Sequence, residues 1–447
     1  MAGSGAPMRS VAVHTLGCRL NRYESDGILQ KFVESGRYEA RSIEEGPDVA
    51  IVNSCTVTDQ ADGRNRQAIR QILRKNPNCS IVVTGCFAQT DPDLLRELPG
   101  VALVVGNDRK SRLFELLEQH FQKTATAMPF EAVLDHRMRP GIEEPFAYGA
   151  VLPQGHTRAY LKIQDGCDRR CSYCKIPMAR GRGISRAYAA IQEHLRVLES
   201  QAVPEVVLTG VNLGWYRDPE TKQRFVPMLE ELLGGLSHTR LRLSSIEPCD
   251  VDAPLARLTT HPLLCSFLHV PVQSGSTAIL RRMRRTYSAE SFRRRVETAK
   301  GINPDIFLGT DLIVGFPGES EADFQASLTL LEQLEFARIH AFPFSPRRQT
   351  VAAQLPGRVP PGIVRERMAR VRELSKRLAL RYARRFIGTA REAVLEPGRQ
   401  PGVWHGLTDN FLRVELPAGM SAESCLVSVT IDRVDEHGVK GSLLARA

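Results

Sequence analysis

Residues 159–177, AYLKIQDGCDRRCSYCKIP, join an apolar run to a loop rich in cysteine. The run Ala159–Ile163 predicts a strand. The loop behind it carries Cys167, Cys171 and Cys174 with the spacing C-x3-C-x2-C. Three thiols within eight residues form a metal-ligand arrangement, because thiolates are soft ligands that suit iron–sulfur clusters and zinc.

Two metals could use these thiols, and the surrounding sequence favours one of them. A structural zinc ion would need a fourth ligand nearby, from a second C-x2-C pair or from histidines. The next forty residues offer only His194, which lies inside a predicted helix. Three cysteines on a four-iron cluster instead leave one iron open, as a substrate-binding metal requires. The loop therefore favours an iron–sulfur site over zinc or three buried cysteines.

Six runs between residue 158 and about 345 predict strands separated by helical stretches. They are Ala159–Ile163, Glu205–Leu208, Leu241–Ser245, Ser266–Val272, Phe307–Val314 and Ala337–Phe342. Six β/α units fit either an open partial barrel or a doubly wound sheet, and the pattern does not decide between them. Polar residues and glycines follow several strands, where such folds bind ligands. The candidates are Gly210, Ser244, Glu247 and Gln273, although each taken singly fits a turn or cap equally well.

The first 120 residues show the same alternation and predict a separate parallel α/β sheet. Its strands are Ser10–Leu16, Asp48–Asn53, Ser80–Thr84 and Val101–Val105. Cys18, Cys55 and Cys86 each follow one of these strands, and the ends of parallel strands share one edge. Gly17 and Gly85 let the backbone turn tightly before two of them. The pattern predicts a second three-thiolate site, with buried core cysteines as an equal alternative.

The remaining segments suggest a linker, a basic helix and a small β-barrel. Residues 122–157 contain several prolines and glycines and predict a connection between domains. A basic helix covers Pro360–Arg385, with the apolar residues Met368, Val371, Leu374, Leu378 and Tyr382 at helical spacing, and its arginines fit a solvated face as well as an RNA contact. The arginine runs at 281–285 and 293–295 fit phosphate binding or a solvated surface. Beyond Gly388, short β-like runs separated by turns predict a β-barrel, with strands at Arg391–Leu395, Phe411–Glu415, Cys425–Asp432 and Val439–Leu444. We therefore expect domains at 9–121, 153–386 and 387–447, with a linker at 122–152.

Bulk properties agree with a multidomain, polyanion-binding protein. The chain has 447 residues, 42% of them hydrophobic, and a formal net charge of +10. Nucleic acid is the first partner that such a charge suggests, although many basic proteins bind none. No apolar run is long enough for a membrane span, and no secretory signal precedes the first strand. We expect a cytoplasmic protein without membrane partners, whose ten cysteines stay reduced.

The central loop, with Tyr173 before its last cysteine, resembles that of radical S-adenosylmethionine enzymes. The resemblance implies a partial (β/α)6 barrel and a [4Fe-4S] cluster on Cys167, Cys171 and Cys174. The open iron would bind the amino and carboxyl groups of S-adenosylmethionine, and the reduced cluster would cleave it to a 5′-deoxyadenosyl radical. The implied cofactor contacts are Glu247 to the ribose, Gly210 to the methionine part, and Tyr173, Ser244 and Gln273 elsewhere on S-adenosylmethionine.

The N-terminal stretches HTLGCRLNRYES, VNSCTVTDQADGRNRQ and TGCFAQ resemble methylthiotransferases. In that family a second [4Fe-4S] cluster would sit on Cys18, Cys55 and Cys86 and supply the sulfur chemistry. Asn21 and Asn53 would order the backbone around it. The C-terminal segment, with GTA at 388–390 and HGLTDNF at 405–411, is similar to a TRAM barrel, an RNA-binding module.

Further motifs are most similar to the methylthiotransferase branch that acts on threonylcarbamoyladenosine in tRNA. They are LKIQDGC, IPMARGRG, GVNLG, RLSSIEP and HAFPFSPR, together with HTLGC of the N-terminal stretch. The implied product is the 2-methylthio derivative at position 37, beside the anticodon. One S-adenosylmethionine would methylate a sulfur, and a second would yield the radical that helps replace the C2 hydrogen. The partners would be the tRNA anticodon stem-loop, a reductant such as flavodoxin or ferredoxin, and an unassigned sulfur donor.

The sequence departs from the family pattern in places and leaves three alternatives. Asp168–Arg170 and Lys175 make the cluster loop unusually basic, Met178 stands where tyrosine is common, and Arg19 replaces a typical lysine. These departures leave the six cysteines intact and bear on the substrate. The alternatives are the same chemistry on N6-isopentenyladenosine of tRNA, the same chemistry on an aspartate of a ribosomal protein, and a non-catalytic zinc-stabilised RNA-binding protein.

Overall fold

The computed structural model describes residues 8–56, 59–123, 130–137, 140–398, 403–417 and 426–444. The chain forms two compact units. The first contains the chain up to Gln154, Tyr160–Arg170 and Cys174–Arg186, and the second contains Gly155–Ala159, Cys171–Tyr173 and Ala187 onward. Among the described residues, no helix is both long and apolar enough to span a membrane.

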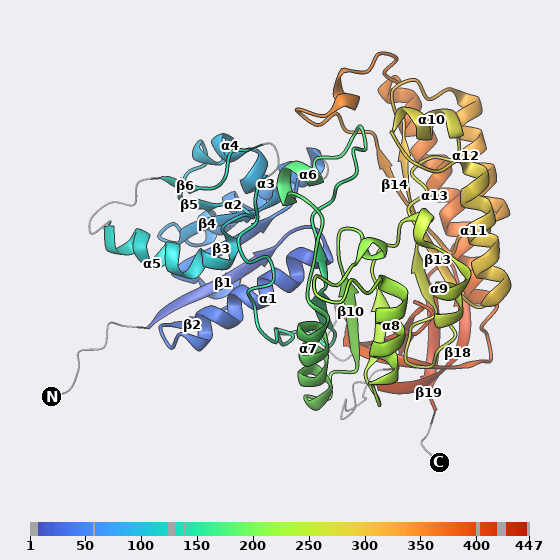
Figure 1. Cartoon of the computed structure of the whole chain (residues 1–447), viewed down its shortest axis with the longest axis horizontal. Helices are drawn as coiled ribbons and strands as arrows, with labels where there is room; N and C mark the ends of the chain where they lie inside the picture. The colour runs from blue at the N-terminus through green and yellow to red at the C-terminus, as the bar shows by residue number, and fades with distance from the viewer. Residues whose placement is uncertain are drawn as a thin grey trace. The chain divides into compact units, whose positions relative to one another are not determined.

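A parallel sheet of six strands forms the centre of the first unit, with the order β2-β1-β3-β4-β5-β6 (Figure 1). The strands are β1 (Arg9–Thr15), β2 (Tyr38–Ala40), β3 (Val49–Ser54), β4 (Ser80–Gly85), β5 (Val101–Val105) and β6 (Glu131–Val133). The chain leaves β1 toward β2 on one side and then returns to β3 on the other. This reversal makes the gap between β1 and β3 a topological switch point, where doubly wound sheets bind ligands.

Helices cover both faces of this sheet, which explains why its central strands are continuously apolar. They are α1 (Arg19–Glu34), α2 (Asp59–Lys75), α3 (Cys86–Thr90), α4 (Pro92–Arg96) and α5 (Leu113–Lys123). Val49 and Ile51 of β3 pack against α1 and α5, whereas Ala50 and Val52 pack with α2, α3 and α4. Alternate residues of one strand therefore stabilise opposite layers.

The segment predicted as a linker contributes to this unit. β6 pairs with β5, and Tyr148 and Val151 join the core beneath α1 and α5. The prolines and glycines of this segment suggested a linker. β6 could not be predicted because its three residues show no measurable alternation. The first unit also includes α6 (Ile176–Arg180) and a hairpin of β8 (Gln164–Asp165) and β9 (Ile184–Ser185).

Two three-stranded sheets follow, with the orders β11-β10-β7 and β12-β13-β14. Their strands are β7 (Ala159–Lys162), β10 (Glu205–Thr209), β11 (Arg240–Leu243), β12 (Phe267–His269), β13 (Phe307–Val314) and β14 (Arg338–Pro343). Parallel bridges from Leu241 to Leu264 and from Ser245 to His269 join β11 to the segment of β12. The strands thus follow one another in sequence order without a reversal. That order confirms a partial barrel and excludes a doubly wound sheet.

Helices connect these strands and accompany them on the outside. They are α7 (Tyr188–Ser200), α8 (Phe225–Gly234), α9 (Ala253–Leu258), α10 (Thr277–Arg282), α11 (Ala289–Ile302), α12 (Glu321–Gln333) and α13 (Pro361–Arg384). Figure 1 shows α11, α12 and α13 as a layer beside β13 and β14. The basic helix α13 buries its predicted apolar stripe, including Val371, Leu374 and Leu378.

The C-terminal strands close into a five-stranded barrel, so this part of the predicted fold is also confirmed. They are β15 (Ala390–Pro397), β16 (Trp404–Thr408), β17 (Arg413–Leu416), β18 (Leu426–Asp435) and β19 (Gly438–Leu443). β16 was not predicted as a strand, and Cys425, at the start of a predicted run, lies outside the described residues. Val414 and Ile431 of this barrel share one core with Phe267, Phe307 and Tyr382.

A buried ion cluster binds the C-terminal barrel to the strands of the central one. Glu205 accepts hydrogen bonds from Arg240 Nε at 2.9 Å and from Arg242 Nε at 2.8 Å. The other guanidinium nitrogens donate to backbone carbonyls of Glu392, Leu407, Thr408 and Asp409. Because Glu205 and Arg240 begin β10 and β11, this contact occupies the amino ends of the strands. It leaves the carboxyl ends, where barrel enzymes bind substrate, uncovered by this cluster.

Candidate functional site

The N-terminal cysteines lie beside the switch point of the first sheet. Cys18 caps α1 after β1, Cys55 follows β3, and Cys86 opens α3 after β4. These three strands are neighbours, so their carboxyl ends form one edge. The amino end of α1 carries the positive end of the helix dipole, which favours a thiolate at Cys18.

Two glycines bring the three turns into contact. Gly17 has φ +102° and Gly85 has φ +100°, in the region that side chains rarely adopt. A Cβ on Gly17 would lie 2.6 Å from Cys55 Cβ and 2.9 Å from its Sγ. A Cβ on Gly85 would lie 2.3 Å from the carbonyl oxygen of Ser54. The turns of Cys18 and Cys86 therefore both press against the turn of Cys55.

The three thiols lie at the same edge of the sheet, but they differ in exposure and are not grouped closely enough to form a set of metal ligands. Cys18 is exposed as a residue, whereas Cys55 and Cys86 are buried. Among the described residues, no three thiol, imidazole or carboxylate groups stand ready to hold a metal ion. The fit of an iron–sulfur cluster here rests on the donor chemistry, three soft thiols, and on their placement at adjoining strand ends.

Asparagine amides fix the backbone around these cysteines. Asn21 Nδ2 donates to the carbonyls of Leu16 at 2.7 Å and Ser54 at 3.0 Å, and so ties the first turn to the second. Asn53 Nδ2 donates to the Asn21 carbonyl at 2.9 Å. Asn65 Nδ2 donates to the Cys55 carbonyl at 2.6 Å. The edge is therefore ordered by buried hydrogen bonds, which are costly to break.

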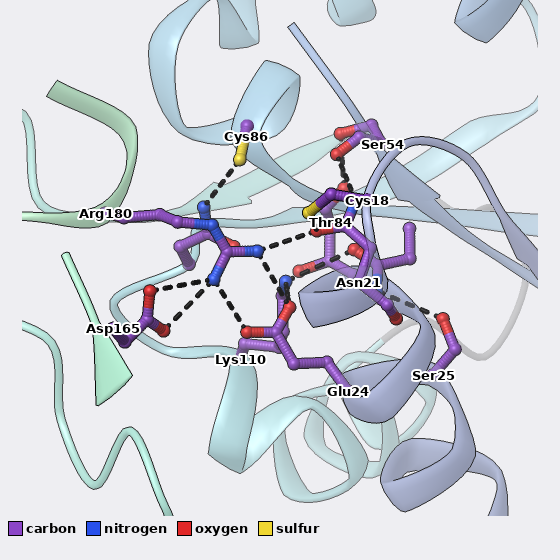
Figure 2. Close-up of polar contacts among 12 residues, drawn as sticks. Cys18, Asn21, Glu24, Ser25, Ser54, Thr84, Cys86, Lys110, Asp165 and Arg180 are labelled. Atoms are coloured by element: carbon purple, nitrogen blue, oxygen red, sulfur yellow. Dashed lines mark hydrogen bonds and ion pairs between the residues drawn. The ribbon is translucent and has the colours of Figure 1, made fainter. Parts of the chain in front are cut away.

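A buried network of five charged side chains, which sequence reasoning missed, lies beside this edge, and Figure 2 labels its members Glu24, Lys110, Asp165 and Arg180. Arg180 Nη1 contacts Glu24 Oε1 at 2.9 Å and Asp165 Oδ2 at 3.0 Å. Lys110 Nζ lies 2.6 Å from Glu24 Oε2. Lys162 Nζ lies 3.0 Å from Glu24 and 2.9 Å from Asp165. We call Glu24, Lys110, Lys162, Asp165 and Arg180 the Arg180 network.

Electrostatics in this region follow from burial and from the three cations. Burial opposes ionisation of Glu24, but Arg180, Lys110 and Lys162 hold its pKa well below the usual range. Close packing raises the pKa of the Cys18 thiol even though the residue is exposed, and the Arg180 charge acts in the opposite direction. The guanidinium of Arg180 is therefore near enough to Cys18 for their charges to interact.

The central cysteine loop receives hydrogen bonds on each of its sulfurs. In the first unit, the Arg169 amide donates to Cys167 Sγ and the Ile176 amide to Cys174 Sγ, both at 3.4 Å. In the second unit, Arg285 Nη1 donates to Cys171 Sγ at 3.2 Å. Donors of this kind stabilise thiolates and tune iron–sulfur clusters, so the loop fits such a group.

The predicted cofactor residues of the second unit lie where the strands end. Gly210 follows β10, Ser244 and Glu247 follow β11, and Gln273 follows β12 with φ +62°. Ser244 Oγ is buried and makes no hydrogen bond within the described structure. An orphaned polar atom at this edge suits a polar ligand. Tyr173 packs edge-on to Phe316, with ring centroids 6.5 Å apart.

Arg285 is a further residue of this edge that sequence reasoning did not single out. Its guanidinium contacts Glu247 and Cys171 together, and its Nε donates to the Tyr287 hydroxyl at 3.1 Å. In the sequence it stood within a run of arginines assigned to phosphate binding or a solvated surface. Only the fold reveals that this member of the run is buried, with 9% of its surface exposed.

Comparison with known families and structures agrees with this architecture. Residues 10–106 match the uncharacterized protein family UPF0004, and residues 161–331 match the Radical SAM superfamily. Among solved structures, a radical S-adenosylmethionine methyltransferase from Kitasatospora setae, TsrM, with cobalamin and a [4Fe-4S] cluster bound, has a TM-score of 0.54. It is 16% identical, and 75% of each chain is covered, so it supports the fold alone.

Relatives named as tRNA methylthiotransferases match over nearly the whole chain. The threonylcarbamoyladenosine tRNA methylthiotransferase MtaB of Bacillus subtilis is 35% identical, covering 91% of this chain and 90% of the relative. The protein of that name from Thermotoga maritima is 35% identical, covering 97% and 96%. The family resemblance expected from the cysteine motifs is thereby confirmed. The chain belongs to the threonylcarbamoyladenosine tRNA methylthiotransferase family within the radical SAM superfamily.

Proposed function

We propose that this protein converts N6-threonylcarbamoyladenosine at position 37 of tRNA to its 2-methylthio derivative. The observation that carries the proposal is the pair of three-cysteine groups in one chain. Cys167, Cys171 and Cys174 follow a barrel strand, and Cys18, Cys55 and Cys86 follow the neighbouring strands β1, β3 and β4 of a separate sheet. Relatives with this name match over nine-tenths of the chain.

Each cysteine group would hold one [4Fe-4S] cluster. With S-adenosylmethionine bound, the cluster on the central loop would supply radical chemistry, and the N-terminal one would supply sulfur chemistry. Gly210, Ser244, Glu247 and Gln273 follow strands of the central barrel and would orient S-adenosylmethionine. Arg285 holds Glu247 and so fixes the carboxylate proposed for the ribose hydroxyls.

Partners and organisation follow from this chemistry. The anticodon stem-loop would be the part of tRNA that is bound, and the net charge of +10 suits its phosphates. A reductant of the flavodoxin or ferredoxin type would supply electrons in the cytoplasm, where tRNA is found. We propose domains at 9–121, 153–386 and 387–447. Residues 122–152 would connect the first two while lending β6 to the first sheet.

Mass spectrometry of tRNA nucleosides from cells with and without the gene tests the substrate. Loss of the 2-methylthio-threonylcarbamoyl nucleoside, with its precursor accumulating, is the expected result. If 2-methylthio-isopentenyladenosine disappears instead, the reaction stands and the substrate is wrong. If neither nucleoside changes, tRNA is not the substrate, and an aspartate of a ribosomal protein becomes the target to test.

Cys55→Ala separates the two cysteine groups. The variant should still cleave S-adenosylmethionine but should make no methylthio product, because only the N-terminal site has lost a ligand. Cys79→Ala is the matched control, since Cys79 is equally buried near the same sheet but lies outside the group. A Cys55→Ala protein that still methylthiolates tRNA would contradict the two-site mechanism.

A further inference from the structure

The Arg180 network contains one more positive than negative charge. Lys110, Lys162 and Arg180 contribute three positive charges, and Glu24 and Asp165 contribute two negative ones. All five side chains are at least 95% buried. A net charge removed from water is costly unless an opposite charge or strong dipoles compensate it.

The buried cluster of Glu205, Arg240 and Arg242 shows how a surplus positive charge can be compensated without a further anion. Arg240 and Arg242 outnumber Glu205, but their remaining nitrogens donate to four backbone carbonyls. In the Arg180 network, by contrast, none of the three cations donates to a backbone carbonyl of a described residue. They reach carboxylates and the side-chain amide oxygens of Asn21 and Asn53. Backbone carbonyls therefore do not compensate the surplus positive charge of the Arg180 network, as they do in the cluster of Glu205.

Two asparagines connect this network to the N-terminal cysteines. Asn21 Oδ1 accepts a hydrogen bond from Arg180 Nη2 at 2.7 Å and lies 3.8 Å from Cys18 Sγ. Asn107 Nδ2 donates to the carbonyl of Ala179, beside Arg180, at 2.8 Å and lies 3.6 Å from Cys86 Sγ. In this view, Figure 2 shows Cys86 above the Arg180 guanidinium and Cys18 to its right. The surplus charge thus adjoins the thiols themselves.

We propose that the Arg180 network is the fixed counter-charge of the N-terminal iron–sulfur site, and that Arg180 and Lys110 set its reduction potential as positioning residues. The inference rests on the proposed function. An oxidised four-iron core carries two positive charges and three thiolates carry three negative ones, so the assembled group is singly negative. One surplus buried cation matches that charge, and net charge is a principal determinant of cluster potential.

The test isolates the N-terminal site in the full-length protein. Cys167, Cys171 and Cys174 are replaced by Ala, and the protein is reconstituted anaerobically with iron and sulfide. Iron content and the midpoint potential from an EPR-monitored redox titration are then measured. Arg180→Gln removes a positive charge and should lower the potential. A tenfold decrease in the equilibrium constant for one-electron reduction corresponds to a midpoint potential that is lower by about 59 mV. Arg180→Lys keeps the charge and should restore the potential.

Glu24→Gln gives the decisive comparison, because it disturbs the same contacts with the opposite charge. It should raise the midpoint potential, whereas loss of packing alone would move both variants in one direction. Arg367→Gln is the control, a buried arginine paired with Glu319 outside the network, and it should leave the potential unchanged. If Arg180→Gln does not fold, Lys110→Gln takes its place with the same expected sign.

Two results would overturn the inference, and they are distinguishable. Iron bound normally with unchanged potentials, or shifts of equal sign in Arg180→Gln and Glu24→Gln, would overturn it while leaving the proposed function intact. An iron-free protein after removal of the three central cysteines would overturn both, because the N-terminal site would then hold no cluster. Opposite shifts in the two variants would establish the network as the counter-charge.

Discussion

Single cysteines of this chain differ in reactivity for reasons visible in their surroundings. Burial raises the pKa of Cys79 to about 11 and that of Cys265 to about 12. At pH 8 fewer than about one in a thousand of these thiols is ionised, and the thiolate is the reactive form. Packing raises the pKa of the Cys18 thiol as well, but Cys18 is exposed at the start of α1, whereas Cys79 and Cys265 are buried, so of these three thiols the reagent can reach only Cys18. We therefore expect iodoacetamide to modify Cys18 in the metal-free protein and to spare Cys79 and Cys265.

Reconstitution with iron and sulfide should protect Cys18, since a ligated thiolate no longer attacks the reagent. Peptide mass spectrometry after timed alkylation measures each site separately, and Cys79 and Cys265 serve as internal references. Equal labelling of Cys18 before and after reconstitution would contradict its assignment as a ligand.

Chemistry-bearing residues were predictable from sequence only where their type and position carried the signal. The six cysteines could be predicted as ligands because each follows a predicted strand or shares a short loop with two others. Arg180, Lys110 and Arg285 could not be found this way, because a charged residue in a basic stretch is ordinarily solvated. Their burial depends on partners such as Glu24, which lies 156 residues from Arg180 in the chain.

The turns that follow the strands of the first sheet require particular backbone shapes. Gly85→Ala would place a Cβ 2.3 Å from the Ser54 carbonyl oxygen, at a residue with φ +100°. Backbone strain of this kind costs about 1–3 kcal/mol, and Ser54 must move as well. We expect lower unfolding stability and less iron at the N-terminal site of the variant that lacks the central cysteines.

Gly63→Ala is the matched control for that substitution. Gly63 lies within α2, and nothing occupies the 4 Å around its added Cβ. Alanine at such a helical position should stabilise the protein by up to about 1 kcal/mol. Denaturant unfolding and iron analysis of both variants check the pair, and a Gly85→Ala protein with full iron would show that the turn can relax.

The contact between the C-terminal barrel and strands β10 and β11 depends on one carboxylate. Burial alone would raise the pKa of the Glu205 carboxylate, but Arg242 and Arg240 hold this pKa well below its usual range. Glu205→Gln would leave two buried guanidinium groups without their anion, which costs about 3–5 kcal/mol. We expect a lower denaturation midpoint and easier proteolytic cleavage near Gly388. Arg196→Gln, on an exposed pair with Glu193, should change neither.

The same carboxylate gives a sign to the pH dependence of this contact. Its folded pKa lies below the unfolded value of about 4.3, so its stabilisation is present above that value. The stabilisation is lost only as pH falls through the lower folded pKa. Proteolysis of the wild type should therefore be unchanged between pH 7 and pH 5.

Strand prediction succeeded for long elements and failed for short ones. β3, β4, β5 and β13 have five to eight residues, and their apolar runs were recognised within about two residues. β2 and β6 have three residues each and lie at the two edges of the first sheet. Edge strands of that length carry too little alternation to be distinguished from loops.

At the scale of the whole molecule, topology decided what pattern could not. Six β/α units fitted a barrel and a doubly wound sheet alike, and only the bridges at Leu241 and Ser245 fix the sequential order. The N-terminal sheet is instead doubly wound, because its strand order reverses between β1 and β3. Pairing between distant strands is a tertiary property, and no local window of sequence contains it.

The net charge of +10 leads to a prediction about the complete chain and its substrate. Binding that neutralises phosphates releases counterions, so affinity falls steeply with salt. If about five phosphates of the anticodon stem-loop are contacted, raising salt from about 50 to 200 mM should weaken binding about 100-fold or more. Fluorescence anisotropy with a labelled stem-loop measures the slope, and circular dichroism over the same range controls for unfolding. A flat dependence would mean that the basic residues serve the internal ion pairs described above, and that tRNA is recognised through its bases instead.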